Sequence, residues 1–415
     1  MACAVETGFA ASESTIGVTP SGAIFYSPAN TENTVARSLD NGATWQLLQP
    51  PQMQYTALWN TVDPYLTVDR RTRRVFWLHV TGPTRTTPLL VSESVLSSGL
   101  PTAIAFAYGF QVYSTPDDGR TWRTAEYSTA PMADWEKIFV GPPPRNGAQP
   151  SGYPSVVYVC ANSPVEVAGP GRLCYKSLDG GATFNPAGYV FPSPSTPDAC
   201  LALNTDNGVV GNDGTIYHPV TCRGGSYVAS SGDEGATYSW VRVPSAPGAG
   251  SGIPGGVGFQ LAIDHADNLY ALWLAENRLS LAVSRDHGRT WGGPLTVSAP
   301  GVHDIALPAI AAGPRGAVGI TYYASVRAGA SGLTAYITET SRALDGNPVW
   351  LSGAINDPRR PIFHDYGFSG SPRADYVGGT FDSHGAFWAG VVKQLAPPDA
   401  NGNIKTTGYV GRLVR

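Results

Sequence analysis

Short runs in which apolar and polar side chains alternate recur along the whole chain. In residues 279–283, Leu-Ser-Leu-Ala-Val, every second side chain is apolar, so an extended segment would have one apolar face. This period of two is typical of a half-buried β-strand. Several runs come in pairs joined by a tight turn, such as 261–263 with 269–273 and 310–312 with 318–320. The pattern therefore predicts antiparallel hairpins.

One octapeptide, Ser/Thr-x-Asp-x-Gly-x-Thr-aromatic, stands five times after a predicted strand. In a hairpin turn the Asp carboxylate can accept backbone N–H bonds, and Gly takes the positive φ that other residues resist. Thr and the aromatic residue then begin the next strand. We expect the central aspartates to have a structural role. They are Asp40, Asp117, Asp179, Asp233 and Asp286, and a degenerate sixth copy spans residues 341–350.

Four predicted strands make up each repeating unit: strand A, a tight turn, strand B, a longer loop, strand C, the octapeptide turn and strand D. Sheets repeated radially at this period are the blades of a β-propeller. We count seven blades in one all-β propeller domain, residues 1–415, with six blades as the alternative because the second and sixth units are irregular. The units begin near Ser12, Asp63, Glu136, Cys200, Gln260, His303 and Asp375.

The last predicted strand, residues 408–414, is the third of its blade and has no fourth strand after it. We expect residues 4–9, within the N-terminal segment 1–11, to supply that fourth strand.

Composition narrows the classes of protein. Only 14% of the residues are charged, with 27 Lys and Arg against 31 Asp and Glu, a net charge of −4. Helical bundles need charged residues on their solvent faces, so a bundle is excluded. Nucleic acids and anionic membranes need a concentrated basic surface, which argues against both as partners. No apolar run approaches 18 residues, so we expect no transmembrane helix.

The cysteines point to an oxidising compartment. Cys160 ends one apolar run and Cys174 begins the next, while Cys200 and Cys222 bracket a similar stretch; we expect two disulfides, with Cys3 left over. Disulfides favour a secreted or cell-surface protein. Residues 1–6 lack a basic region followed by an apolar stretch, which fits a mature segment behind an added Met, a truncated prepeptide or a cytosolic start.

The octapeptide resembles the Asp boxes, or BNR repeats, of the sialidase-like β-propeller superfamily, and the resemblance covers roughly residues 12–415. Residues 375–379, followed by Asp382, Gly385 and Trp388, are similar to the last blade of secreted bacterial sialidase-like proteins. The resemblance implies that the boxes lie on the face opposite the pocket. Superfamily members include sialidases, other glycosidases, polysaccharide lyases and non-catalytic propellers.

Blade topology divides the polar residues between two faces. The A–B and C–D turns share one face, while the D–A and B–C loops share the other, where a ligand site is expected. Catalytic candidates on the second face are Asp375, Tyr376, His364, Tyr366 and Asp63. Substrate-binding candidates are Arg373, His303, Asp304, Glu13, Trp135 and Glu276.

Three chemistries are considered for these residues. A sialidase needs an arginine clamp for the substrate carboxylate and a tyrosine nucleophile, but the family's Arg-Ile-Pro motif is not in this sequence. A uronate lyase would use Tyr366 or Tyr376 with His364 and Arg373. A neutral-sugar hydrolase would use two carboxylates, for which the candidates are Asp63, Asp365 and Asp375.

The sequence thus predicts an exported carbohydrate-active enzyme, a glycoside hydrolase or polysaccharide lyase, that acts on an extracellular glycan. The alternative is a non-catalytic propeller for glycan or protein binding or cell-surface assembly. The predicted reaction requires no cofactor or catalytic metal, but the turn aspartates could bind a structural calcium ion.

Overall fold

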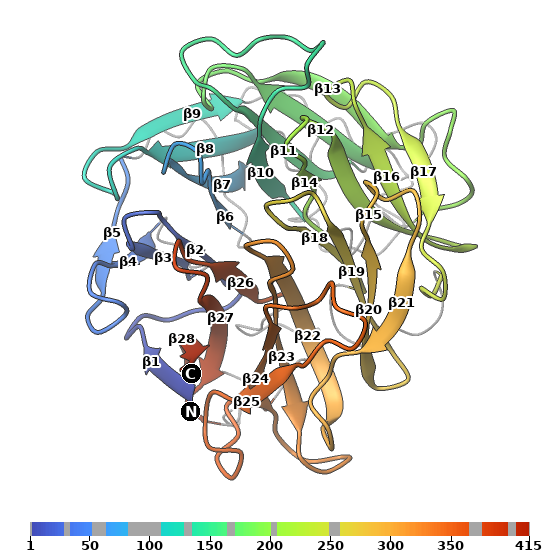
Figure 1. Cartoon of the computed structure of the whole chain (residues 1–415). Coiled ribbons are helices and arrows are strands. Elements are labelled where there is room, and N and C mark those ends of the chain that lie inside the picture. Colours follow the sequence, from blue (N-terminus) through green and yellow to red (C-terminus); the bar gives the residue numbers. More distant parts are fainter. Residues whose placement is uncertain are drawn as a thin grey trace, which may run out of the picture. The chain divides into compact units, whose positions relative to one another are not determined.

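The computed structural model describes residues 2–28, 34–51, 64–81, 109–127, 135–163, 171–200, 206–248, 258–364, 376–396 and 404–414 (Figure 1). Its strands form seven four-stranded antiparallel sheets, the blades of an all-β propeller. Six sheets use four consecutive strands each, so the order of the strands in the chain is also their order in the sheet. The six-blade alternative is therefore excluded.

The chain folds into two compact units, residues 49–242 and residues 1–48 with 243–415. In the first unit, β10 lies next to both β6 and β14, and each A strand begins its own blade. The first blade of this unit comprises β6 (Tyr65–Val68), β7 (Val75–Thr81), β8 (Gly109–Thr115) and β9 (Arg123–Tyr127). The second comprises β10 (Lys137–Gly141), β11 (Val156–Ser163), β12 (Gly171–Ser177) and β13 (Asn185–Phe191). The third comprises β14 (Val209–Val210), β15 (Ile216–Cys222), β16 (Gly225–Ser231) and β17 (Ser239–Arg242).

The other unit holds four blades. Three of them are made of consecutive strands, and the fourth takes its outer strand from the N-terminus. The first comprises β2 (Thr15–Val18), β3 (Ile24–Ser27), β4 (Val35–Ser38) and β5 (Gln46–Leu48). The second comprises β18 (Phe259–Ile263), β19 (Leu269–Ala275), β20 (Arg278–Ser284) and β21 (Gly292–Thr296). The third comprises β22 (His303–Ala312), β23 (Val318–Ser325), β24 (Thr334–Thr340) and β25 (Leu351–Ala354). The fourth comprises β26 (Gly378–Phe381), β27 (Phe387–Gln394), β28 (Thr406–Leu413) and β1 (Ala2–Glu6).

The two ends of the chain meet in one sheet. Strand β1 pairs antiparallel with β28, with Ala4 opposite Gly411 and Glu6 opposite Tyr409. An ion pair at 2.5 Å joins Glu6 to Lys393 of β27, whose ammonium lies 5.6 Å from the ring centroid of Tyr409. The N-terminal segment therefore supplies the fourth strand of the last blade.

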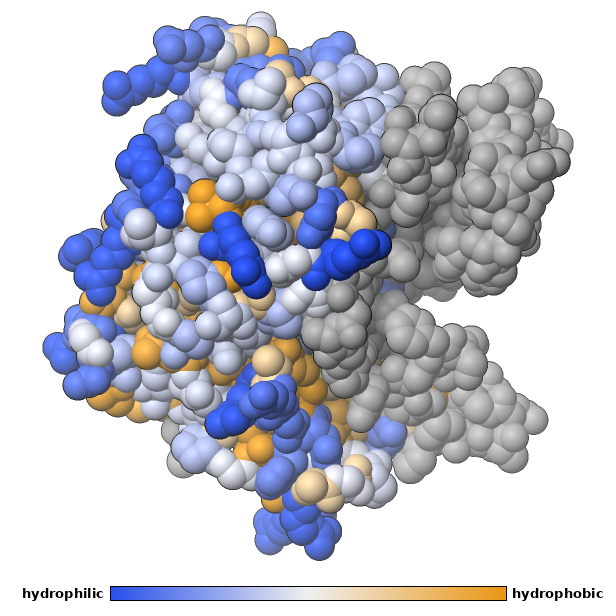
Figure 2. All heavy atoms as spheres, turned by 90° about the vertical axis from the view of Figure 1, so that its right-hand side faces the viewer, coloured by the Kyte–Doolittle hydropathy of each residue, from blue (hydrophilic) through white to orange (hydrophobic). Residues whose placement is uncertain are grey.

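The apolar side chains pack between neighbouring sheets. The cores of both units are rich in Tyr, Phe, Val, Leu and Ile side chains, many of them with no exposed surface. On the face drawn in Figure 2, hydrophilic residues predominate and hydrophobic ones gather in small separate areas. Within the ranges described above, no helix has the length and apolar character needed to cross a membrane.

One predicted blade boundary is wrong. The fourth blade along the chain begins with β14 at Val209, nine residues after the predicted start near Cys200. Cys200 instead forms an isolated bridge with Cys222, to which it is disulfide-bonded. The second predicted disulfide, Cys160–Cys174, also forms, between directly opposite residues of β11 and β12. A covalent link rather than a strand ladder thus holds Cys200 in place.

All five octapeptides form the same turn. The Asp carboxylate accepts the Thr N–H at 2.8–2.9 Å and the Thr hydroxyl at 2.5–2.7 Å. The leading Ser or Thr hydroxyl accepts the Gly N–H at 2.8–2.9 Å. The Thr hydroxyl and amide bonds lower the pKa of Asp40 and of Asp286 to about 2, so both stay ionised.

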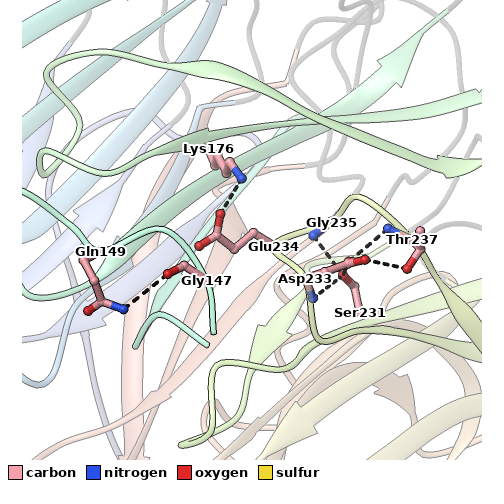
Figure 3. A network of polar contacts seen from close by, with 8 residues as sticks. All are labelled: Gly147, Gln149, Lys176, Ser231, Asp233, Glu234, Gly235 and Thr237. Carbon is pink, nitrogen blue, oxygen red and sulfur yellow. Dashed lines mark hydrogen bonds and ion pairs between the residues drawn. The ribbon is translucent and has the colours of Figure 1, made fainter. Parts of the chain in front are cut away.

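Figure 3 shows the fourth copy, in which Ser231, Asp233, Gly235 and Thr237 make these bonds. The variable position after the Asp is Glu234, whose buried carboxylate is ion-paired with Lys176 of the neighbouring blade. The turn thus also fastens two blades together.

Candidate functional site

The sequence-predicted site residues fall into three groups. Asp63, Tyr366, Arg373 and Asp375 lie outside the described residues, as does Asp365. His303, Asp304, Glu276, His364, Tyr376 and Glu13 belong to the four-blade unit, and Trp135 belongs to the three-blade unit.

Asp304 holds a loop in place. It follows His303 at the start of β22 and has a φ of 49°. Its Oδ2 atom accepts the N–H of Gly329 at 2.8 Å and lies 2.7 Å from the hydroxyl of Ser325, at the end of β23. These bonds fix the B–C loop of the same blade to the start of its A strand.

Glu276 is a solvent-exposed turn residue. With Asn277 it forms the two-residue turn between β19 and β20, and both residues have positive φ, at 49° and 60°. This is the conformation of a type I′ hairpin. The Glu276 carboxylate, 83% exposed, pairs with Arg278 at 3.2 Å, while the side chain of Asn277 accepts the N–H of Ile305 at 3.1 Å.

His364, Tyr376 and Glu13 differ in exposure. The backbone N–H of His364 donates to Oε1 of Gln394 at 2.5 Å, and its Nδ1 lies 3.4 Å from the carbonyl oxygen of Ser331. Tyr376 is 5% exposed and Glu13 is 7% exposed. Of these three predicted residues, His364 is thus the one with an accessible side chain.

The structure brings together a second set of polar residues that sequence reasoning missed, except for Trp135. We call it the loop-side cluster: Tyr65, Trp135, Lys137, Arg172 and Asp206. Tyr65 and Lys137 open the A strands β6 and β10, Trp135 precedes β10, Asp206 precedes the A strand β14, and Arg172 is the second residue of the C strand β12. A strands and C strands both begin at the D–A and B–C end of a blade, so the topology gathers these residues from three neighbouring blades.

Two buried cations form the centre of the loop-side cluster. The Lys137 ammonium lies 4.6 Å from the ring centroid of Tyr65 and 4.9 Å from that of Trp135. Arg172 donates from Nη1 to the carbonyl oxygen of Trp135 at 2.7 Å, and the same nitrogen lies 3.3 Å from Oδ1 of Asn162. Lys137 is 1% exposed and Arg172 is not exposed at all. Cation–π contacts are strongest when they are desolvated in this way.

The two titratable groups at the rim are shifted toward their protonated forms. Tyr65 and Asp206 are half-buried. Burial raises the pKa of Asp206, although the charges of Lys137 and Arg172 act in the opposite direction. Burial, with the nearby Asp206 charge, also raises the pKa of Tyr65 far above its usual value. The cluster therefore offers a carboxyl group that keeps its proton to higher pH than an ordinary Asp, beside two fixed cations.

A signal for these residues was present in the sequence. Lys137 is followed by Ile-Phe-Val, and Arg172 is followed by Leu-Cys-Tyr, in a chain with few charges. A charge at the start of an otherwise apolar strand marks the end of the blade at which polar groups can gather. Asp206 carried no such signal, because it precedes a strand of only two residues.

Two groups of side chains have a spacing close to that of metal ligands. One is Cys160, Cys174 and His218, and the other is Asp198, Cys200 and Cys222. All four sulfurs are in disulfides and so are not thiolates, the form in which cysteine binds metals. Neither group is a metal site in this oxidised chain.

Comparison with known proteins supports the fold. No protein-family model and no curated protein sequence matches the chain. A streptogramin B lyase structure is 10% identical with a TM-score of 0.51, covering 99% of this chain and 98% of the lyase. The Hadza microbial sialidase Hz136 is 18% identical with a TM-score of 0.44, covering 78% of this chain.

The chain spans 65% of the length of that sialidase. A third similar structure is the α-L-arabinofuranosidase Arb93A from Fusarium graminearum, 12% identical with a TM-score of 0.45, covering 88% of this chain and 96% of that one. At such identities the likeness extends to the fold alone.

Proposed function

We propose that the chain is an exported glycoside hydrolase whose site includes the loop-side cluster and whose substrate carries an anionic sugar. The observation that carries this proposal is the position of Asp206, a half-buried carboxyl group with a raised pKa, beside the buried cations Lys137 and Arg172. The two disulfides support export, because such bonds persist in oxidising compartments.

Each member of the cluster has a distinct part in this proposal. Asp206 supplies a proton to the leaving oxygen of the glycosidic bond, the task for which a carboxyl group with a raised pKa is suited. Tyr65, a half-buried residue, offers an aromatic side chain against which a sugar can pack. The charges of Lys137 and Arg172 act on Asp206 and attract a sugar carboxylate in a low-dielectric surrounding. Asp63, two residues before Tyr65 in the chain, stays the predicted second carboxylate.

Hydrolysis is preferred to elimination on the chemistry of the described residues. A lyase needs a base, and a phenol that has lost its proton is one of the usual choices. Tyr65 holds its proton tightly, because burial and the charge of Asp206 raise its pKa. The loop-side cluster instead supplies an acid, Asp206, which hydrolysis needs.

The test is turnover of a panel of neutral and acidic oligosaccharides by the wild type, Asp206→Asn and a control, Asp213→Asn. Asp213 lies in the A–B turn at the other end of β14 and bonds to the N–H of Thr215 at 2.9 Å. Loss of a general acid should lower kcat/KM by about 10²–10⁴-fold, while the control should keep wild-type turnover. Equal turnover by Asp206→Asn and the wild type would exclude Asp206 as the acid.

A second function, glycan binding without catalysis, is favoured by the near-complete burial of Lys137 and Arg172. Buried cations can stabilise a binding surface without touching a reacting bond. This function predicts no turnover of any glycan, together with calorimetric binding of an acidic oligosaccharide that weakens in Lys137→Met. The hydrolase predicts turnover and a loss of preference for acidic over neutral substrates in the same variant.

A further inference from the structure

An arginine-rich hairpin lies at the end of β6 opposite to the loop-side cluster. Residues 69–74 join β6 to β7 and read Asp-Arg-Arg-Thr-Arg-Arg. We call this the arginine hairpin. It holds four of the 27 basic residues of a chain that is sparsely charged, and the proposed function makes no use of it.

The backbone of the arginine hairpin is held firmly by Asp69, which is 3% exposed. Its Oδ1 accepts the N–H of Arg71 at 2.9 Å, and its Oδ2 accepts the hydroxyl of Tyr153 at 2.5 Å. Its own N–H donates to the carbonyl oxygen of Arg74 at 2.8 Å, and its carbonyl oxygen accepts the N–H of Arg73 at 2.8 Å. The guanidinium groups thus extend from a preorganised turn.

Three of these guanidinium groups, those of Arg71, Arg73 and Arg74, form no ion pair with a carboxylate of the described residues. Arg74 lies over the Tyr153 ring at 4.5 Å and donates to the carbonyl oxygen of Gly180 at 3.1 Å. Arg71 donates to the carbonyl oxygen of Pro154 at 3.3 Å. Within the described part of the chain, no carboxylate lies within 4.0 Å of Arg71, Arg73 or Arg74 in an ion pair. Three positive charges therefore share one turn without a described acidic partner.

Arg73 occupies a position at which an arginine is unfavourable. It stands two residues before its B strand with a φ of 67°, in the left-handed region. Five other blades also have a residue with positive φ two positions before the B strand. Those residues are Gly22, Gly214, Asp267, Gly316 and Gly385. Glycine adopts this conformation without strain, so the exposed arginine makes the folded state less stable than a glycine would. Such backbone strain is typical of a functional residue.

We propose that the arginine hairpin binds the anionic groups of an acidic polysaccharide. A guanidinium is planar and binds a sulfate or carboxylate through two parallel N–H bonds. Tyr153 is 5% exposed and already has Arg74 over its ring, so it cannot stack on a nucleobase. An acidic sugar has no base to stack, so guanidinium groups can bind its sulfate or carboxylate without a free aromatic ring. This site is independent of the proposed hydrolytic site.

The test is binding of the full chain to heparin, polygalacturonate, neutral dextran and a DNA duplex of matched charge over a series of salt concentrations. The probe variants are Arg71→Gln with Arg73→Gln, and Arg73→Gly alone. The control is Arg289→Gln with Arg315→Gln, two exposed arginines of turns in the other unit. We expect the wild type to bind heparin or polygalacturonate but not dextran.

The double probe variant should bind at least tenfold more weakly and reduce the slope of log affinity against log salt by about two, since each lost contact removes about one. The control should bind like the wild type. Arg73→Gly should fold at least as well as the wild type, because glycine suits the φ of 67°, so weaker binding in it reports the lost charge. No binding by the wild type, unchanged binding by the double variant, or equally tight binding of DNA would each overturn the proposal.

Discussion

Two buried histidines of the three-blade unit, His79 and His218, should make the protein sensitive to acid. The ring of His79 packs edge-on against Trp77, with centroids 4.1 Å apart, and neither of its nitrogens has a hydrogen-bond partner within the described residues. In His218, Nε2 lies 3.9 Å from the sulfur of Cys174. Burial lowers the pKa of each histidine to about 3, and the charge of Arg172 adds to the effect at His218.

The sign and size of the effect follow from proton linkage. An exposed histidine in the unfolded chain has a pKa of about 6.5, so at pH 5 the unfolded state binds a proton that the folded state does not. Stability is therefore full above about pH 6.5 and falls as the pH drops toward 3. Lowering the pH from 7 to 5 should lower the free energy of unfolding by about 2 kcal/mol for each histidine, or about 4 kcal/mol for both.

The assay is urea unfolding followed by tryptophan fluorescence at pH 7 and pH 5. The variants are His79→Gln with His218→Gln, and His384→Gln as a control, because His384 lies in an exposed turn. The double variant should lose most of the pH-dependent part of its stability, whatever its stability at pH 7, and the control should behave like the wild type. An undiminished drop between pH 7 and pH 5 in the double variant would refute the reasoning.

Three further changes test the fold. Asp264→Ala should lower the free energy of unfolding, measured by urea unfolding, by about 3–5 kcal/mol. The carboxylate accepts hydrogen bonds from a tyrosine hydroxyl and from backbone N–H groups of two turns. Each buried donor left without its partner costs about 1–3 kcal/mol. The Cys160–Cys174 disulfide closes a short loop. Its reduction should lower the free energy of unfolding by about 3 kcal/mol relative to the unreduced chain, in the same assay. Gly214→Ala should lower the midpoint of thermal unfolding far more than Gly22→Ala. Both glycines have positive φ, but a Cβ at position 214 would lie 2.3 Å from a proline nitrogen, whereas a Cβ at position 22 would lie in open space. Equal losses in the two glycine variants would contradict the packing argument.

The fold could be predicted because it is encoded locally and repeatedly. Each octapeptide carries the residues that its turn needs, the acceptor of Asp40 or Asp286 and a glycine at positive φ, within eight positions. Repetition then fixes the number of strands per blade. The start of the fourth blade was mispredicted because Cys200 is held by a disulfide to Cys222, a contact that leaves no alternating pattern around it.

At the candidate site, the sequence did not distinguish residues that contact a ligand from residues that hold the fold. Asp304 was expected to bind substrate, and in the structure its carboxylate holds the loop at Gly329. Trp135 was expected to offer a surface to a sugar, whereas the residue is 8% exposed and its ring lies under the Lys137 ammonium. A polar residue on a loop has the same sequence signature whether it meets a ligand or its own backbone, so only its partners distinguish the two.

The amino-acid sequence by itself determined the class of fold, the blade repeat, the turn aspartates and both disulfides, because each depends on residues close together in the chain or on a repeated pattern. Only the tertiary structure decided that Tyr65, Lys137, Arg172 and Asp206 lie close together. These residues are spread over more than 140 positions and three blades. Their pKa values and their partners depend on distances and burial, which arise when neighbouring blades pack and which no local pattern records.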